Sequence, residues 1–177
     1  MTAILHPSMQ DFEDVFQFMN RCDIEEYGEP DTSRQDFEEL WSEIDLDQDA
    51  WIIRDDQNNL IGYASIREAT TSYIQELYVS LELSPIGIED QLMKVCEDRA
   101  KQQISFSHQL EKSSITGYAV SVNQRLQQMY ERFGFARHNY HYQMRIDFTE
   151  PYVPPQWPQQ YRLESYSEKY EQELYHL

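Results

Sequence analysis

Apolar residues follow a helical period in the middle of the chain. The apolar positions of this segment are Ile88, Leu92, Val95, Cys96 and Ala100. Just before it, Tyr73–Val79 is rich in β-branched and aromatic residues, and Pro85 and Gly87 then interrupt the chain. The pattern predicts a strand, a tight turn and an amphipathic helix. The free N–H groups of such a helix lie at the end of the sheet, where a phosphate can bind.

The segment before Tyr73 predicts a short strand, two helices and a hairpin. Ala3–Leu5 is the expected strand, and Ser8 is the expected N-cap of a helix whose apolar positions are Phe12, Val15, Phe16 and Met19. The acidic segment Asp23–Pro30 contains Gly28 and predicts a loop. Thr32 or Ser33 then caps a second helix, which an acidic connection, Asp45–Asp49, follows.

Two apolar runs, Ala50–Ile53 and Leu60–Ile66, flank turn-forming residues and predict a β-hairpin. Asn58 and Asn59 can adopt the left-handed conformation that this turn requires. Gly62, inside the second run, indicates a bulge or a close approach of another backbone segment.

After the central helix, the polar segment Phe106–Ser114 predicts a loop and Ile115–Val122 predicts a strand. Asn123 is the expected start of a helix that Gly134 ends in the left-handed conformation. The aromatic segment His138–Phe148 predicts one or two further strands.

The composition changes at Pro151, where a proline-rich segment extends to Pro158 and predicts a stiff linker. Tyr161–Tyr166 then predicts a strand, and Ser167–Leu177 predicts a short helix. We expect a domain over residues 1–150 and a linker with a C-terminal extension over residues 151–177. The extension is either the start of a second lobe or a segment that packs on its own domain or on a partner.

The chain has 177 residues, 40% of them hydrophobic, which fits one globular domain. Its net charge of −18 argues against nucleic acid and anionic membranes as partners, and favours either a solvated acidic surface or attraction of a cationic amine. Two lone cysteines provide neither a disulfide framework nor a metal site, and Cys96 is expected in the core. No apolar run is long enough to span a membrane, and MTAILHPSMQD lacks the features of a signal peptide, so we expect a cytoplasmic protein.

One pair of motifs carries a family resemblance. A strand ending at Val79 precedes a turn and a helix, and downstream Asn123, Tyr130 and Gly134-Phe135 stand at a distinctive spacing. This layout resembles the GNAT superfamily of acetyl-CoA-dependent N-acetyltransferases. The resemblance implies an α/β fold, with a mixed, mostly antiparallel sheet flanked by helices on both faces. Some members of this superfamily consist of two tandem lobes joined by a proline-rich linker. This chain also resembles such a protein, and in that case it corresponds to the first lobe.

The resemblance implies Tyr130 as the general acid for the departing thiolate, and its alternative role is an aromatic on the core face of a helix. Glu76, on a largely apolar strand, is the candidate general base, because burial would raise its pKa. Glu76 could instead face solvent or pair with a neighbour. His138 and His141 are alternative bases near the end of the sheet.

The resemblance also implies an acetyl-CoA site. Its expected cofactor-binding residues are Leu77, Val79, Ser84, Gly87, Ile88 and Asn123. Asn123 can also serve as a helix N-cap. The pyrophosphate loop departs from the family pattern: Ser84 replaces Arg or Gln, Pro85 replaces a glycine, and Glu89 replaces Gly or Ala. We therefore expect weakened or lost cofactor binding at this loop.

Two hypotheses follow from these residues. The first is an N-acetyltransferase that transfers the acetyl group of acetyl-CoA to a primary amine by direct attack, and the acidic chain favours a small cationic amine as the acceptor. The second is a degenerate, non-catalytic domain that serves as a structural or dimerisation lobe. The aromatic residues of the tail make a homodimer a candidate assembly.

Overall fold

The computed structural model describes residues 3–69, 72–107, 114–142, 144, 146, 153, 156–171 and 175. The chain forms two compact units, Met1–Arg137 and His138–Leu177. The domain boundary expected at residue 150 remains a prediction.

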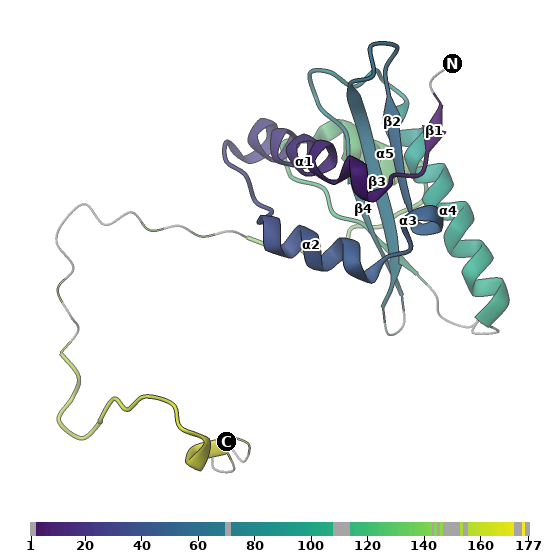
Figure 1. Cartoon of the computed structure of the whole chain (residues 1–177). Helices are drawn as coiled ribbons and strands as arrows, with labels where there is room; N and C mark the ends of the chain where they lie inside the picture. Colours follow the sequence, from purple (N-terminus) through teal and green to yellow (C-terminus); the bar gives the residue numbers. More distant parts are fainter. Residues whose placement is uncertain are drawn as a thin grey trace. The chain divides into compact units, whose positions relative to one another are not determined.

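The first unit is built on a five-stranded sheet with the order β1-β2-β3-β4-β5 (Figure 1). The strands are β1 (Ile4–Leu5), β2 (Ala50–Arg54), β3 (Leu60–Glu68), β4 (Tyr73–Tyr78) and β5 (Ile115–Thr116). Each neighbouring pair is antiparallel except β4 and β5, which are parallel. The predicted mixed, mostly antiparallel sheet is therefore confirmed, as is the β2–β3 hairpin, in which Asn58 has a positive φ of 67°.

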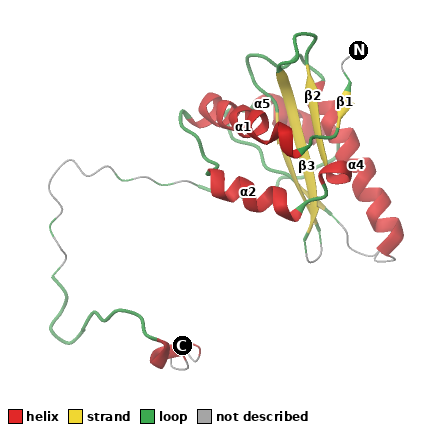
Figure 2. Ribbon diagram, viewed as in Figure 1, coloured by secondary structure: helices red, strands yellow, loops and turns green. Residues whose placement is uncertain are grey.

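Helices cover both faces of this sheet, as predicted (Figures 1 and 2). On one face lie α1 (Phe12–Tyr27) and α2 (Arg34–Glu43), which pack on Ala50, Ile52 and Tyr63. On the other face lie α4 (Ile88–Ser107) and α5 (Gln124–Arg132). A short helix, α3 (Leu46–Asp49), occupies the predicted acidic connection.

The caps predicted from the sequence are present. The Ser8 side chain accepts a hydrogen bond from the Gln10 N–H, at the start of a short 3₁₀ helix (η1, Met9–Asp11) that leads into α1. Ser33 caps α2, and its hydroxyl accepts the Asp36 N–H. Gly134 follows α5 with a φ of +83°, a conformation that glycine adopts without a Cβ clash.

Gly62 explains how α4 approaches the sheet so closely. A Cβ at this position would lie 2.9 Å from Ile88 Cγ2 and 3.0 Å from Leu92 Cδ1. The strand register also shifts beside it, between Ile53 and Arg54. The register shift agrees with the bulge expected at Gly62, whereas the atoms that approach it belong to side chains of α4 and not to another backbone segment.

Three predicted boundaries are wrong. The Asp23–Pro30 loop is helical up to Tyr27, because Gly28 (φ +85°) ends α1 rather than marking the middle of a loop. The Phe106–Ser114 loop begins later, because α4 continues to Ser107. The Ile115–Val122 strand has only Ile115–Thr116 paired with β4.

The second unit contains a short 3₁₀ helix, η2 (Glu168–Tyr170), inside the predicted Ser167–Leu177 helix. The predicted strand Tyr161–Tyr166 is not formed. In His138–Phe148, the described residues 138–142, 144 and 146 are not in a strand, and the remaining positions lie outside the described residues.

Candidate functional site

An open strand edge lies where β4 and β5 separate. Their pairing ends at Ile74 and Thr116. The Tyr73 N–H donates to the Ser114 carbonyl at 2.8 Å, so the main chain of Tyr73 faces β5. Because backbone groups alternate along a strand, the N–H and C=O groups of Leu77 and Val79 face the same side, beyond the last β5 pair. An extended ligand can form strand-like hydrogen bonds there.

Tyr130 lies beside this edge without a hydrogen-bond partner. Its side chain projects from α5, is only 7% exposed, and packs on Phe135 with ring centroids 4.9 Å apart. A Cβ at Gly117, the residue directly after β5, would overlap the Tyr130 hydroxyl and ring. The hydroxyl makes no hydrogen bond within the described structure. Burial raises the pKa of Tyr130 above its ordinary value, so the phenol stays protonated at neutral pH.

Asn123 connects α5 to the end of α1. Its Oδ1 accepts the Leu126 N–H at 2.9 Å, which makes it the predicted N-cap of α5. Its Nδ2 donates to the carboxylate of Glu26, and the side chain is 1% exposed. Asn123 therefore fixes the start of the helix that carries Tyr130, and its contribution to a cofactor stays a prediction.

The last turn of α1 also holds the end of β4. The Glu25 carboxylate accepts the Ser80 hydroxyl at 2.7 Å and the Leu81 N–H at 2.6 Å. Asp23 accepts the N–H groups of Asp31 at 3.1 Å and Thr32 at 3.4 Å. Sequence reasoning missed these roles because it predicted this acidic segment as a loop.

Glu76 lies on the face of β4 that packs toward α1 and α2. It pairs across the sheet with Ser65, next to the Tyr63–Tyr78 pair on the same face. Burial, and then the nearby charge of Asp23, raise its pKa, while Arg67 partly opposes them. Within the described residues its carboxylate makes no hydrogen bond and no ion pair. It is therefore available to accept a proton at a pH where an ordinary glutamate would be a weak base.

The loop between β4 and α4 is closed by contacts within the protein. The Ser84 hydroxyl donates to the Ile61 carbonyl at 2.5 Å. Arg125 of α5 donates to the Ser84 carbonyl at 2.7 Å and also to the Glu89 carboxylate. The Gly87 N–H donates to Glu89 Oε2 at 3.1 Å. Sequence reasoning missed Arg125, because only the fold brings it to this loop.

The predicted site residues thus form two groups. Leu77, Val79 and Tyr130 lie at the open edge, and their polar groups, which are not paired with β5 in the described structure, fit the amide-bearing arm and thioester of the acetyl-CoA that the resemblance implies. Ser84, Gly87 and Ile88 lie at the closed loop, where the Gly87 amide already binds a carboxylate. This second group does not fit a pyrophosphate as the family motif does. His138 and His141 belong to the other unit, so their relation to the site stays a prediction.

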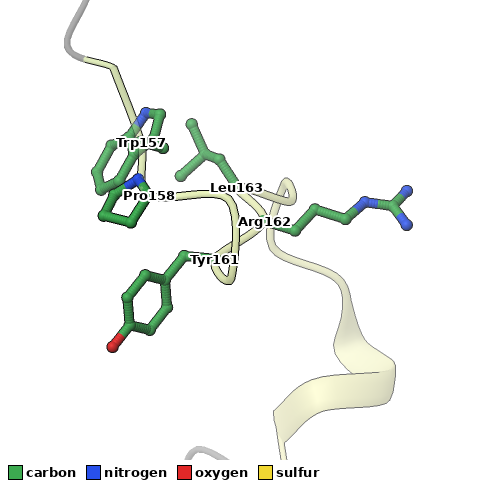
Figure 3. A pocket seen from close by; sticks show the side chains of 5 residues that line it. All are labelled: Trp157, Pro158, Tyr161, Arg162 and Leu163. Atoms are coloured by element: carbon green, nitrogen blue, oxygen red, sulfur yellow. The ribbon is translucent and has the colours of Figure 1, made fainter.

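An apolar pocket lies in the second unit and contains none of the predicted site residues (Figure 3). It is lined by Trp157, Pro158, Tyr161, Arg162 and Leu163. Trp157, Pro158 and Leu163 lie close together, while the Arg162 side chain extends away from them. No group of three acidic, histidine or cysteine side chains in the described residues is arranged to hold a metal. None of the described helices is long and apolar enough to cross a membrane.

Comparison with known proteins gives a consistent family. A family model described as an acetyltransferase (GNAT) domain matches residues 21–146. The structure of a GCN5-related N-acetyltransferase from Sphaerobacter thermophilus is similar, with a TM-score of 0.69 at 16% identity. That similarity covers 76% of this chain and 43% of the other, so this chain spans less than half of that protein. A search of curated proteins found no match.

Two further structures are similar over most of their own length. A GNAT-family acetyltransferase from Staphylococcus aureus has a TM-score of 0.61 at 16% identity, covering 78% of this chain and 87% of that one. Spermidine N-acetyltransferase from Vibrio cholerae, solved with CoA and spermine, has a TM-score of 0.53 at 22% identity. Here the coverage is 78% of this chain and 82% of the other. At these identities, the structural likeness shows a shared fold.

Proposed function

The chain belongs to the GNAT acetyltransferase family, and from that premise we propose that it transfers the acetyl group of acetyl-CoA to a primary amine. The observation that carries this proposal is the open β4 edge with the unpartnered Tyr130 hydroxyl beside it. A buried polar group without a partner destabilises a fold, so its presence favours a ligand that satisfies it.

The main-chain groups of Leu77 and Val79, beyond the last residue of β4 that pairs with β5, would hold the amides of the donor arm in the manner of an added strand. Bound acetyl-CoA supplies an acetyl group activated as a thioester. The protein's part is to hold that thioester still against the amine, because positioning accounts for much of the rate in such reactions.

Glu76 is the proton acceptor and Tyr130 is the proton donor of the proposed reaction. Glu76, whose pKa burial raises, accepts a proton from the ammonium group of the substrate. Tyr130, whose pKa burial also raises, keeps its proton at neutral pH and is the donor to the departing thiolate. Glu76 lies on the α1/α2 face of β4, and Tyr130 belongs to the core on the α4/α5 face. The proton of the amine is therefore accepted on one face of the sheet, and the thiolate is protonated from the other.

The acceptor in this proposal is a small cationic amine. Asp23, Glu26 and Glu76 all have a pKa raised by burial, with the Glu26 pKa partly lowered by the hydrogen bond from Asn123. A cation near these groups would relieve the cost of their buried charge. The chain's net charge of −18 attracts such a substrate from solution. The similar structure from Vibrio cholerae was solved with spermine, a polyamine.

The test measures thiol release from acetyl-CoA with spermine and with a neutral primary amine of similar size. We expect release that depends on the amine and favours spermine. In Glu76→Gln the rate should fall about 100-fold or more. The control variant is Glu68→Gln, at the exposed end of β3, which should leave the rate unchanged. If the wild-type chain releases no thiol with either amine, the proposed function is wrong.

A second candidate function is a non-catalytic lobe, and the closed loop favours it. Glu89 and Arg125 form an ion pair where the family motif binds pyrophosphate. The Sphaerobacter protein, of which this chain covers 43%, has room for a second lobe of similar size. A chain that binds no acyl donor at millimolar concentration and releases no thiol would support this alternative.

A further inference from the structure

Glu89 lies where the family motif leaves space for an anion. It stands in the first turn of α4 and is 1% exposed. Its carboxylate accepts the Gly87 N–H at 3.1 Å and also a hydrogen bond from its own backbone. These amides belong to the N-terminus of a helix, the place where an external phosphate would otherwise bind. The protein's own carboxylate therefore replaces the external anion.

Arg125 completes this internal anion site. Its guanidinium donates to the Ser84 carbonyl at 2.7 Å, to the Pro85 carbonyl at 2.5 Å and to the Glu89 carboxylate. Burial raises the pKa of Glu89, but the hydrogen bonds from Arg125 and from the backbone outweigh it, so the pKa lies below its ordinary value. Glu89 is therefore ionised at neutral pH.

A second arginine of α5 is also paired with an acid beside this loop. Arg132 pairs with Asp90, the residue after Glu89, at 2.6 Å. A pyrophosphate arriving at the loop would have to displace Glu89 from both the Gly87 amide and Arg125. At the other end of the site, the open β4 edge and the unpartnered Tyr130 hydroxyl are unaffected by this ion pair.

We propose that this site recognises the acyl-pantetheine arm of its donor and gains little from the nucleotide diphosphate, because Glu89 holds the position of the pyrophosphate. The inference rests on the proposed function and deepens it. Donors that share the pantetheine thioester but lack the adenosine diphosphate should bind about as tightly as acetyl-CoA.

Calorimetric titration of the whole chain with acetyl-CoA and with acetylpantetheine tests this directly. We expect dissociation constants within about threefold of each other for the wild-type chain. In Glu89→Gln, acetyl-CoA should bind about 10- to 100-fold more tightly, because the amides and Arg125 become available to phosphate. Acetylpantetheine should bind this variant as it binds the wild type.

The matched control is Asp90→Asn, which removes a neighbouring carboxylate that does not touch the Gly87 amide. It should change the affinity for acetyl-CoA less than threefold. A wild-type preference for acetyl-CoA of tenfold or more would overturn the inference, as would an equal gain for both donors in Glu89→Gln.

The salt dependence of acetyl-CoA binding to the wild type tests the inference even if the Glu89→Gln variant does not fold. If no phosphate contact is made, the affinity for acetyl-CoA should stay level or rise as salt is raised, because salt then screens only the repulsion between the anionic donor and the acidic chain. A clear fall would overturn the inference and leave the proposed function standing. If neither donor binds at any salt concentration, the proposed function itself fails, and this inference fails with it.

Discussion

The two ends of the candidate donor site differ in how their polar groups are satisfied. At the open edge, the main chain of Leu77 and Val79 is not paired with β5, and the Tyr130 hydroxyl has no hydrogen-bond partner among the described residues. At the loop, the Glu89 carboxylate binds both the Gly87 amide and Arg125, although the Arg125 Nε makes no hydrogen bond in the described structure. At the open edge the Tyr130 hydroxyl is left for a ligand to bind, whereas at the loop the Glu89 and Arg125 charges are already paired within the protein. A family motif can therefore retain one half of a binding site while the other half becomes part of the protein's own structure.

The largest expected effect on stability is at the loop between β4 and α4. Arg125→Ala leaves Glu89 as an unpaired, buried carboxylate, so the free energy of unfolding should fall by about 3–5 kcal/mol. Arg132→Ala breaks an exposed ion pair on the same helix and should cost at most about 1 kcal/mol. Urea denaturation of the two variants measures the difference.

A double variant separates the ion pair from simple packing. Replacing Arg125 with Met and Glu89 with Leu removes both charges, and should be much less destabilising than Arg125→Ala. Equal losses in Arg125→Ala and Arg132→Ala would mean that the loop is not held by this pair.

At the open edge of β4, the expected effect is on the rate of acetyl transfer. Tyr130→Phe removes the proposed proton donor and should slow acetyl transfer about 100-fold or more. Because the lost hydroxyl has no partner, the free energy of unfolding should stay constant or rise by up to about 1 kcal/mol. Tyr140→Phe, at an exposed position in the second unit, is the control. Unchanged turnover would remove Tyr130 from the mechanism.

The sequence predicted the elements with strong local signals. The central strand and helix, the β2–β3 hairpin, the Ser33 and Asn123 caps and the end of α5 at Gly134 follow from apolar spacing and from residues with one favoured conformation. Features that depend on distant contacts were missed. Asp23–Tyr27 stays helical despite its charges because its acids bind Ser80, Leu81 and Asn123.

The candidate site shows the same division. Tyr130 was found by its spacing from Asn123, and Glu89 was identified as a carboxylate at the pyrophosphate position. Arg125 was not found, because Ser84, Pro85 and Glu89 lie far from it along the chain. The end of β5 at Thr116 was also missed, since alternation continues to Val122 and only the fold shows where pairing stops.

A smaller effect is expected from crowding at the open end. Gly117→Ala places a methyl group against the Tyr130 ring and hydroxyl, and should lower the free energy of unfolding by about 1–3 kcal/mol. Combined with Tyr130→Leu, the same change should cost less than the sum of the two single changes. Additive losses in this double-mutant cycle would mean that the two residues do not touch.

The smallest effect is a pH-dependent stability at Glu76. Burial raises its pKa above the ordinary 4.5, so the folded protein binds this proton more tightly than the unfolded chain does. Stability contributed by the protonated group is therefore lost as pH rises through the folded pKa. Glu76→Gln should be more stable than the wild type above that pH, by about 1 kcal/mol, and equal to it at about pH 3. Thermal melts across this range measure the difference, and a difference that is constant with pH would contradict the assignment.

The most direct test of the whole account is amide hydrogen exchange, followed residue by residue with NMR, with and without acetyl-CoA. We expect slower exchange at Leu77 and Val79 when the donor is present, because their main chain gains partners. We expect no change at Gly87, whose N–H already binds Glu89. Protection at Gly87 with none at Leu77 and Val79 would contradict the account, because the donor would then be held by the loop and not by the open edge of β4.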